Sequence, residues 1–147
     1  MKVLNASGSS FDLGMQPSKE PVHLEVQLSA DGINWSRPVR LMVDTGNVGP
    51  IFLPAALVAE LDLQLVAIDS SKAEFANGST ESETVVILGG IRFLGIPSNA
   101  PITILEVPAV ISKNATDGLV GLDALALMNT FIKEGRLVLI ELSQRFM

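Results

Sequence analysis

Leu41-Met42-Val43-Asp44-Thr45-Gly46 is the stretch of this sequence that says most about its fold. Three apolar residues run directly into an acid, a hydroxyl residue and a glycine, which indicates the end of a buried strand. A carboxylate there is costly to bury unless it is hydrogen-bonded, paired or exposed at a site. Thr45 supplies a hydroxyl donor and acceptor, and Gly46 lets another backbone or a ligand come close because it has no Cβ. The stretch is therefore a candidate carboxylate-based hydrolytic site.

The composition limits the kinds of protein that this chain can be. Its 147 residues, 48% hydrophobic and 18% charged, fit one folded domain with a sizeable core. The net charge of −6, without a basic cluster, argues against nucleic acid and anionic membranes as partners. The high mean hydropathy is consistent with a buried interface between identical chains.

The residue types also bear on cofactors and location. There is no cysteine, and His23 is the one histidine, which argues against a zinc site. Carboxylate-based hydrolysis needs no metal or organic cofactor, so we expect none. The start lacks the pattern of a signal peptide, and no apolar run approaches the about 18 residues of a membrane helix. We therefore expect a cytoplasmic protein without a membrane partner.

Short segments of alternating or apolar residues predict a chain made mostly of strands. Residues 1–20 are expected to form a loosely ordered N-terminal arm with a short strand near Phe11, and residues 21–147 the folded domain. Asn77-Gly78, within residues 75–86, is the strongest hairpin signal. The other expected strands are 22–28, 39–43, 84–88, 91–94 (after a break at Gly89-Gly90), 102–107, and a final hairpin of 131–132 with 137–142.

Two short helices complete the prediction. Pro54 fits the first turn of a helix that runs to about Leu61, and a second helix is expected from Leu122 to about Asn129. Many short strands with two short helices and no repeats predict an all-β fold, either a small closed β-barrel or a sandwich.

Around Asp44 the sequence resembles the retropepsin-like aspartic proteases, the family of retroviral-type enzymes with bacterial members. That family has a strand ending in apolar-apolar-Asp-Thr/Ser-Gly, and many bacterial members continue into a glycine, an apolar stretch and Leu-Pro before a helix, as residues 49–61 do here. A hairpin with Ala-Asn-Gly follows, matched by Ala76-Asn77-Gly78, and later an apolar-apolar-Gly before a short helix, matched by Leu119-Val120-Gly121. The resemblance covers about residues 20–142, in order, which is far more specific than an isolated Asp-Thr-Gly.

The resemblance implies a closed acid-protease barrel and a role for each matched residue. Asp44 would be the catalytic acid and base, Thr45 and Gly46 would support its loop, and the hairpin would act as a flap over an extended peptide. The implied substrate-binding and flap residues are Asn47, Ala76, Asn77, Gly78 and Ser79, and Leu119, Val120 and Gly121 form the second apolar-glycine element. The family often builds its dimer sheet from chain ends, which makes residues 137–142 a candidate for that sheet.

The expected chemistry needs two carboxylates. Two such groups about 3 Å apart cannot both ionise, so they share one proton, which is the known behaviour of the aspartic-protease pair. One member then acts as base and the other as acid. This chain has one Asp-Thr-Gly and is too short for two lobes, so the second carboxylate would be Asp44 of a second copy, placed by two-fold symmetry. The resulting prediction is a homodimeric aspartic endopeptidase that acts on peptides or unfolded proteins.

Two departures from the family pattern keep other interpretations open. Asn47 stands where Ala or Ser is common, and the hairpin is polar, with Glu81 and Glu83 expected on a solvated face. The same fold could bind a peptide or protein without cutting it. A third interpretation is a β-barrel interaction protein that only dimerises, and Asp44 could then be a structural acid that ends a turn.

Overall fold

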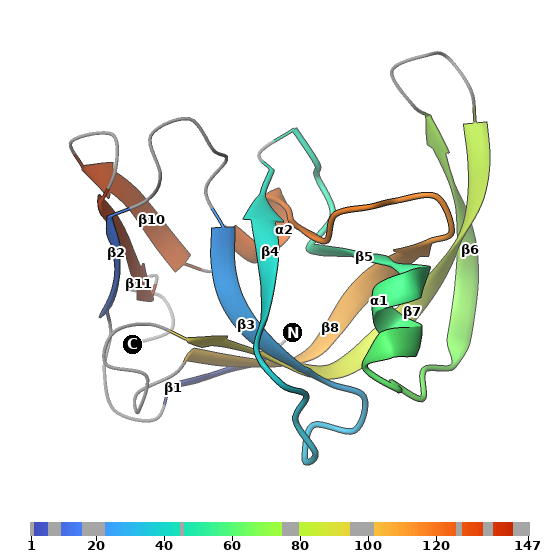
Figure 1. Cartoon of the computed structure of the whole chain (residues 1–147), viewed down its shortest axis with the longest axis horizontal. Helices are drawn as coiled ribbons and strands as arrows, with labels where there is room; N and C mark the ends of the chain where they lie inside the picture. The colour runs from blue at the N-terminus through green and yellow to red at the C-terminus, as the bar shows by residue number, and fades with distance from the viewer. Residues whose placement is uncertain are drawn as a thin grey trace.

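The computed structural model describes residues 2–5, 10–15, 23–44, 46–74, 80–94, 102–125, 128–133 and 137–142. These residues form mostly strands with two short helices (Figure 1). The strands are β1 (Lys2–Asn5), β2 (Ser10–Met15), β3 (His23–Ser29), β4 (Val39–Val43), β5 (Ile51–Pro54), β6 (Ala67–Glu74), β7 (Thr80–Leu94), β8 (Ile102–Ser112), β9 (Leu119–Val120), β10 (Met128–Lys133) and β11 (Leu137–Leu142). The helices are α1 (Ala55–Glu60) and α2 (Leu122–Leu125).

Six of the strands close into a barrel. Their order is β8–β5–β9–β4–β3–β7, and a further antiparallel pairing of β7 with β8 joins the two ends. The remaining strands of this sheet, β1 and β6, pair with β8 and β7 and lie outside the ring. Closure satisfies the strand edges that an open sheet would expose. The predicted fold class, an all-β closed barrel with one or two short helices, is confirmed.

One face of each barrel strand fills the interior. Along β3, Leu24, Val26 and Leu28 are buried and Glu25 is exposed, as expected when successive side chains point to opposite faces. The other strands bring branched apolar side chains to the same core: Leu41, Ile51, Leu53, Val86, Leu88, Ile91, Ile102, Ile104, Val107 and Val120.

The predicted break at Gly89-Gly90 is wrong, because β7 runs without interruption through both glycines. These residues are needed for packing. A Cβ on Gly89 would lie 2.2 Å from the backbone nitrogen of Gly32, and one on Gly90 would lie 2.7 Å from Cη2 of Trp35. Arg92, also on β7, stacks on Trp35, with its guanidinium 4.0 Å from the ring centroid. The loop between β3 and β4 therefore packs directly on the β7 backbone.

Other boundaries also differ from the prediction. The helix expected to reach Asn129 ends at Leu125, and Met128 already begins β10. The strand expected over residues 102–107 continues as β8 to Ser112, because β5 pairs with its second half. The final hairpin is present as β10 and β11, which form a separate three-stranded sheet with β2.

Parts of the expected N-terminal arm belong to the two sheets. Residues 2–5 form β1 and pair with β8, and residues 10–15 form β2 and pair with β11. The strand expected near Phe11 is therefore β2. Neither helix in the described part of the chain has the length and apolar character needed to cross a bilayer.

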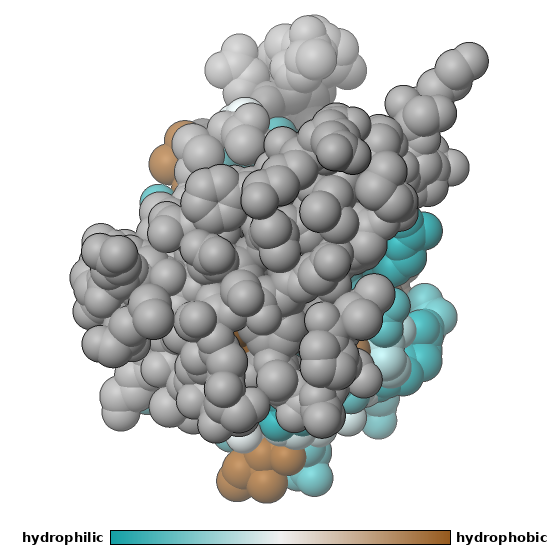
Figure 2. Space-filling view, turned by 90° about the vertical axis from the view of Figure 1, so that its left-hand side faces the viewer, coloured by the Kyte–Doolittle hydropathy of each residue, from teal (hydrophilic) through white to brown (hydrophobic). Residues whose placement is uncertain are grey.

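Several large apolar side chains are exposed. On the side drawn in Figure 2, the apolar described residues that are visible occupy small separate areas. Among the described residues the exposed large apolar side chains are Ile33, Val48, Val66, Ile68 and Ile87.

Candidate active site at the end of strand β4

The strand order places Asp44 in the connection that crosses from β4 to β5 over β9. β4 ends at Val43 and pairs in parallel with β9, which in turn pairs antiparallel with β5. A strand from late in the sequence thus lies between two strands that are consecutive in the sequence. The connection from β4 to β5, which begins with Asp44, has to pass over the end of β9.

Three backbone hydrogen bonds fasten this connection to β9 and α2. The Asp44 N–H donates to the carbonyl of Val120 at 3.0 Å, and the Gly121 N–H donates to the carbonyl of Pro50 at 2.9 Å. The Asp123 N–H, in the first turn of α2, donates to the carbonyl of Val48 at 3.1 Å. Because these bonds use only main-chain atoms, they fix the loop backbone without occupying its side chains.

Gly121 allows the Asp44 loop to lie this close to the end of β9. A Cβ at this position would lie 2.0 Å from the carbonyl oxygen of Gly49 and 2.7 Å from that of Asn47. Leu119 and Val120, which precede it, are the two residues of β9. The structure therefore brings the predicted apolar-apolar-glycine element directly against the loop of Asp44.

The Asp44 carboxylate is half-buried and held by its own loop. Its Oδ1 accepts a hydrogen bond from the Gly46 N–H at 2.9 Å. A Cβ on Gly46 would lie 3.1 Å from the same oxygen, which is tighter than an ordinary contact. Within the described residues Oδ2 accepts no hydrogen bond, so it can accept a proton or a hydrogen bond from a water or a second acid.

Asn47 bonds to its own loop through both backbone and side chain. Its N–H donates to the carbonyl of Asp44 at 3.2 Å, which closes a turn, and its Oδ1 accepts from the Gly49 N–H at 3.1 Å. The second bond is the local Asx type that Asn favours in turns. Asn47, the departure from the family pattern, thus adds two hydrogen bonds within the Asp44 loop.

Five further residues are predicted for the site. Thr45, Ala76, Asn77, Gly78 and Ser79 lie outside the described residues. The strands on either side of the predicted flap are present, since β6 and β7 pair antiparallel up to Glu74 and Thr80.

The expectation that Glu83 is solvated is wrong. This residue of β7 is buried, with 5% of its surface exposed. It lies between two strands, because β7 pairs with β6 at Glu83 itself and with β8 from the next residue on.

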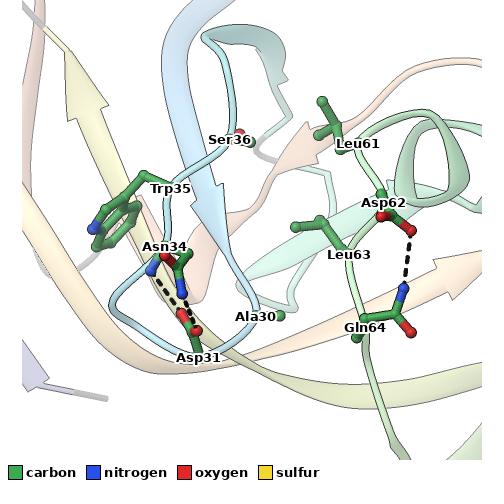
Figure 3. Close-up of a pocket in the computed structure, with 9 residues that line it drawn as sticks. All are labelled: Ala30, Asp31, Asn34, Trp35, Ser36, Leu61, Asp62, Leu63 and Gln64. Atoms are coloured by element: carbon green, nitrogen blue, oxygen red, sulfur yellow. Dashed lines mark hydrogen bonds between the residues drawn. The ribbon is translucent and has the colours of Figure 1, made fainter.

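A second group of polar residues lines a pocket at the other end of β4 (Figure 3). The pocket lies between the β3–β4 loop and the segment that follows α1, and sequence reasoning did not find it. Asp31 bonds to Asn34 within its own loop, and Asp62 bonds to Gln64 within the other segment, so the two carboxylates are engaged locally. The lining residues are Ala30, Asp31, Asn34, Trp35, Ser36, Leu61, Asp62, Leu63 and Gln64.

Asp31 has a structural role, because its carboxylate accepts hydrogen bonds that hold its own loop. Hydrogen bonds from the backbone N–H groups of Asn34 and Ile33, from the Asn34 side chain and from the Ser29 hydroxyl hold the pKa of the Asp31 carboxyl well below its usual range. Hydrogen bonds to the charged form favour that form. A carboxylate held ionised in this way is suited to fixing a loop and unsuited to exchanging protons with a substrate.

No group of three or more His, Cys, Asp or Glu side chains gathers in the described part of the chain in a way that would hold a metal ion. Among the described residues of the connection from β4 to β5, Asp44 is the one with an ionisable side chain.

Comparison with known proteins finds similarity in the fold. No protein-family model matches the sequence, and no curated protein matches it. Among solved structures, the crystal structure of a retropepsin-like aspartic protease from Rickettsia conorii matches with a TM-score of 0.59. The match covers 92% of this chain and 94% of that one, at 12% sequence identity. The fold of this chain is retropepsin-like.

The retropepsin-like fold supports the predicted resemblance at the level of the backbone. At 12% identity the match concerns the arrangement of strands and does not extend to individual side chains. The roles of Asp44 and of the residues around it therefore depend on the local geometry described above and on experiment.

Proposed function

We propose that this chain is an aspartic endopeptidase that works as a homodimer, with one Asp44 contributed by each copy. The observation that carries the proposal is the position of Asp44 in a retropepsin-like fold: it directly follows β4, in a loop bonded to β9 and α2 by main-chain hydrogen bonds. A rigid loop with an available carboxylate oxygen is what a preorganised hydrolytic site requires.

The proposed reaction is the hydrolysis of a peptide bond by water. The ionised Asp44 takes a proton from the water as its oxygen forms a bond to the peptide carbonyl carbon. The protonated Asp44 of the second copy gives its proton to the leaving nitrogen as the carbon–nitrogen bond breaks. Each step needs one acid and one base, which two carboxylates that share one proton supply. The pair titrates as a unit, so no separate pKa belongs to either copy.

Symmetry supplies the second carboxylate in this proposal. A two-fold axis beside the loop brings each Asp44 to its own copy, because an isologous interface repeats the same contacts on both sides. Thr45 and Gly46 then hold the two loops, and the hairpin of residues 76–79 closes over the peptide and keeps water out. The sheet of β2, β11 and β10 contains residues 137–142, the segment predicted for the dimer interface.

The test is cleavage of an unstructured protein at mildly acidic pH by the wild-type chain and by Asp44→Asn. We expect the wild type to release new amino termini and Asp44→Asn to release none, since the amide can neither take nor give the proton. Asp117→Asn is the matched control: this exposed acid also precedes a glycine, in Thr116-Asp117-Gly118, but lies outside the Asp44 loop. Cleavage that survives Asp44→Asn would rule the mechanism out.

The non-catalytic interpretation gives a different result in the same experiment. A binding module of this fold would hold peptides without turnover at any pH, and Asp44→Asn would leave its affinity nearly unchanged. Peptide affinity is therefore measured for both proteins alongside cleavage.

A further inference from the structure

The pocket between the β3–β4 loop and the segment after α1 combines apolar walls with an acid on each side (Figure 3). Leu61 and Leu63 point from one wall toward the opposite loop, where Ala30 contributes to the lining. Asp31 belongs to one wall and Asp62 to the other, and both are exposed. The pocket has a volume of about 340 Å³, and ligand sites in proteins typically have about 300–1,000 Å³.

The charge of this pocket is negative. Among the nine described residues that line it, two are acids and none is a lysine, an arginine or a histidine. Arg37, in the same loop, pairs with Glu60, and Arg92 stacks on the Trp35 ring, so neither arginine lines the pocket. Hydrogen bonds, first of all from backbone N–H groups of its own loop, hold the pKa of Asp31 well below its usual range. This acid therefore stays ionised in mildly acidic as well as neutral solution.

The acids of the pocket keep acceptor capacity for a ligand. The Asn34 side-chain amide donates to Oδ2 of Asp31 at 2.7 Å, and the Gln64 amide donates to Oδ1 of Asp62 at 2.9 Å. Within the described residues, Oδ2 of Asp62 accepts no hydrogen bond. An ammonium or guanidinium group could donate to this oxygen, and charged donors form the stronger hydrogen bonds.

We infer that this pocket is a docking site for a basic side chain, lysine or arginine, of a bound polypeptide. The alkyl stem would pack on Leu61 and Leu63 while the charged end meets Asp62, because long basic side chains cover apolar surface and keep their charge in water. A small cation would leave the apolar walls uncovered, and an apolar side chain would leave the acids without a partner. The net charge of −6 also attracts basic polypeptides over a longer range.

The pocket is separate from the proposed catalytic site. It lies at the end of β4 where the chain enters the strand, whereas Asp44 follows the end where the chain leaves it (Figure 1). The five residues of β4 span about 17 Å. The inference therefore goes beyond the proposed endopeptidase activity, and it does not require cleavage at Asp44.

The fluorescence of Trp35 can report binding, because Trp35 is the one tryptophan of the chain and lines the pocket. The experiment titrates the Asp44→Asn chain, which cannot cut peptides by the proposed mechanism, with three unstructured peptides that lack tryptophan and tyrosine. The peptides differ at one position, which carries lysine, norleucine or glutamate. Norleucine keeps the straight apolar stem of lysine without its charge. We expect the lysine peptide to have the lowest Kd and the glutamate peptide the highest.

Asp62→Asn, made in the same chain, tests the acid of one wall. Asparagine keeps an acceptor for the Gln64 amide and is one of the residues that adopt positive φ, here +51°, so the substitution removes the charge alone. We expect the Kd of the lysine peptide to rise up to about fivefold, the usual size of an exposed ion pair, and that of the norleucine peptide to stay unchanged. Asp117→Asn removes an exposed charge outside this pocket and should change neither Kd.

Three results would overturn the inference. Equal Kd values for the lysine and norleucine peptides would indicate an apolar ligand, and an unchanged Kd of the lysine peptide in Asp62→Asn would exclude the ion pair. A Trp35 signal that follows the concentration of the chain alone would indicate a second copy in the pocket. Each of these results leaves the endopeptidase proposal standing, because that proposal is tested by cleavage. Failure of cleavage together with the expected Kd differences would leave the docking site standing.

Discussion

Gly121 lies so close to Gly49 that a Cβ on the first would stand 2.0 Å from the carbonyl oxygen of the second. This contact joins the end of β9 to the loop that begins with Asp44, two parts of the chain that are far apart in the sequence. The obstructing atom belongs to the backbone, which cannot move aside as a flexible side chain would. The contact therefore sets how closely the Asp44 loop lies on β9.

Gly121→Ala should destabilise the protein and reduce cleavage. The added methyl group forces the two backbone segments apart, and overpacking of this kind typically costs about 1–3 kcal/mol. The free energy of unfolding from urea titration measures the effect. Gly49→Ala is the control from the same loop, because its Cβ would meet Asn47 Oδ1 at 3.5 Å, an ordinary contact. Equal stability of the two variants would contradict this account of the crossing.

Asn47→Ala should reduce stability by about 1 kcal/mol, the usual net contribution of one hydrogen bond. The variant loses the bond from the Gly49 N–H to Asn47 Oδ1. Asn47→Asp keeps an acceptor at that position and should retain most of the stability, while the added negative charge beside Asp44 should move the pH optimum of cleavage upward. Unfolding titrations and pH–rate profiles check the two effects separately, and an unchanged stability in Asn47→Ala would show that the side chain does not hold the turn.

Asp62→Gly should increase stability by about 0.4–1 kcal/mol or slightly more. Asp62 has φ of +51° at the end of α1, a conformation that favours glycine. The N–H groups of Asp62 and Leu63 bond back to the carbonyls of Ala59 and Val58, which is a Schellman motif with aspartate at its glycine position. Asp62→Ala is the matched control and should not stabilise, because alanine is also strained at positive φ. Urea titration gives the free energy of unfolding of the three proteins. A gain in stability in Asp62→Ala as large as in Asp62→Gly would exclude backbone strain as the cause.

Asp31→Ala should lower stability at neutral pH and lose this effect in acid. The pKa of Asp31 is lowered in the folded chain, so as pH falls below the ordinary value of 3.8 the unfolded state takes up the proton first. The stability that the Asp31 carboxylate contributes is therefore present above that value and is lost progressively as pH falls toward the lowered pKa. Free energies of unfolding for wild type and variant should converge below pH of about 4. A difference that stays constant across this range would show that the ionised carboxylate is not what holds the loop.

The sequence identifies the parts of this fold that depend on local pattern. The alternation in residues 22–28 predicts β3, and the apolar run before Asp44 predicts β4 and its end, because both signals come from neighbours in the chain. The break expected at Gly89-Gly90 does not exist, since those glycines accommodate a loop from elsewhere in the chain. A glycine alone does not tell a turn from a close approach of another backbone.

The sequence predicts the separate segments of the candidate site, and the tertiary structure brings them together. Asp44 and Gly121 are both recognisable in the sequence, yet only the insertion of β9 between β4 and β5 shows that they share one loop contact. Glu83 is buried and Val48 is exposed. No pattern in the nearby sequence gives either of them.

The most direct test of the central claim mixes wild-type chains with Asp44→Asn chains at constant total concentration and measures the rate of peptide cleavage after subunit exchange. If catalysis needs an Asp44 from each copy, a mixed dimer is inactive, and an equal mixture should retain about one quarter of the wild-type rate. A chain that used its own Asp44 alone would retain about half, with the rate proportional to the wild-type fraction, and that result would contradict a proton shared between two copies.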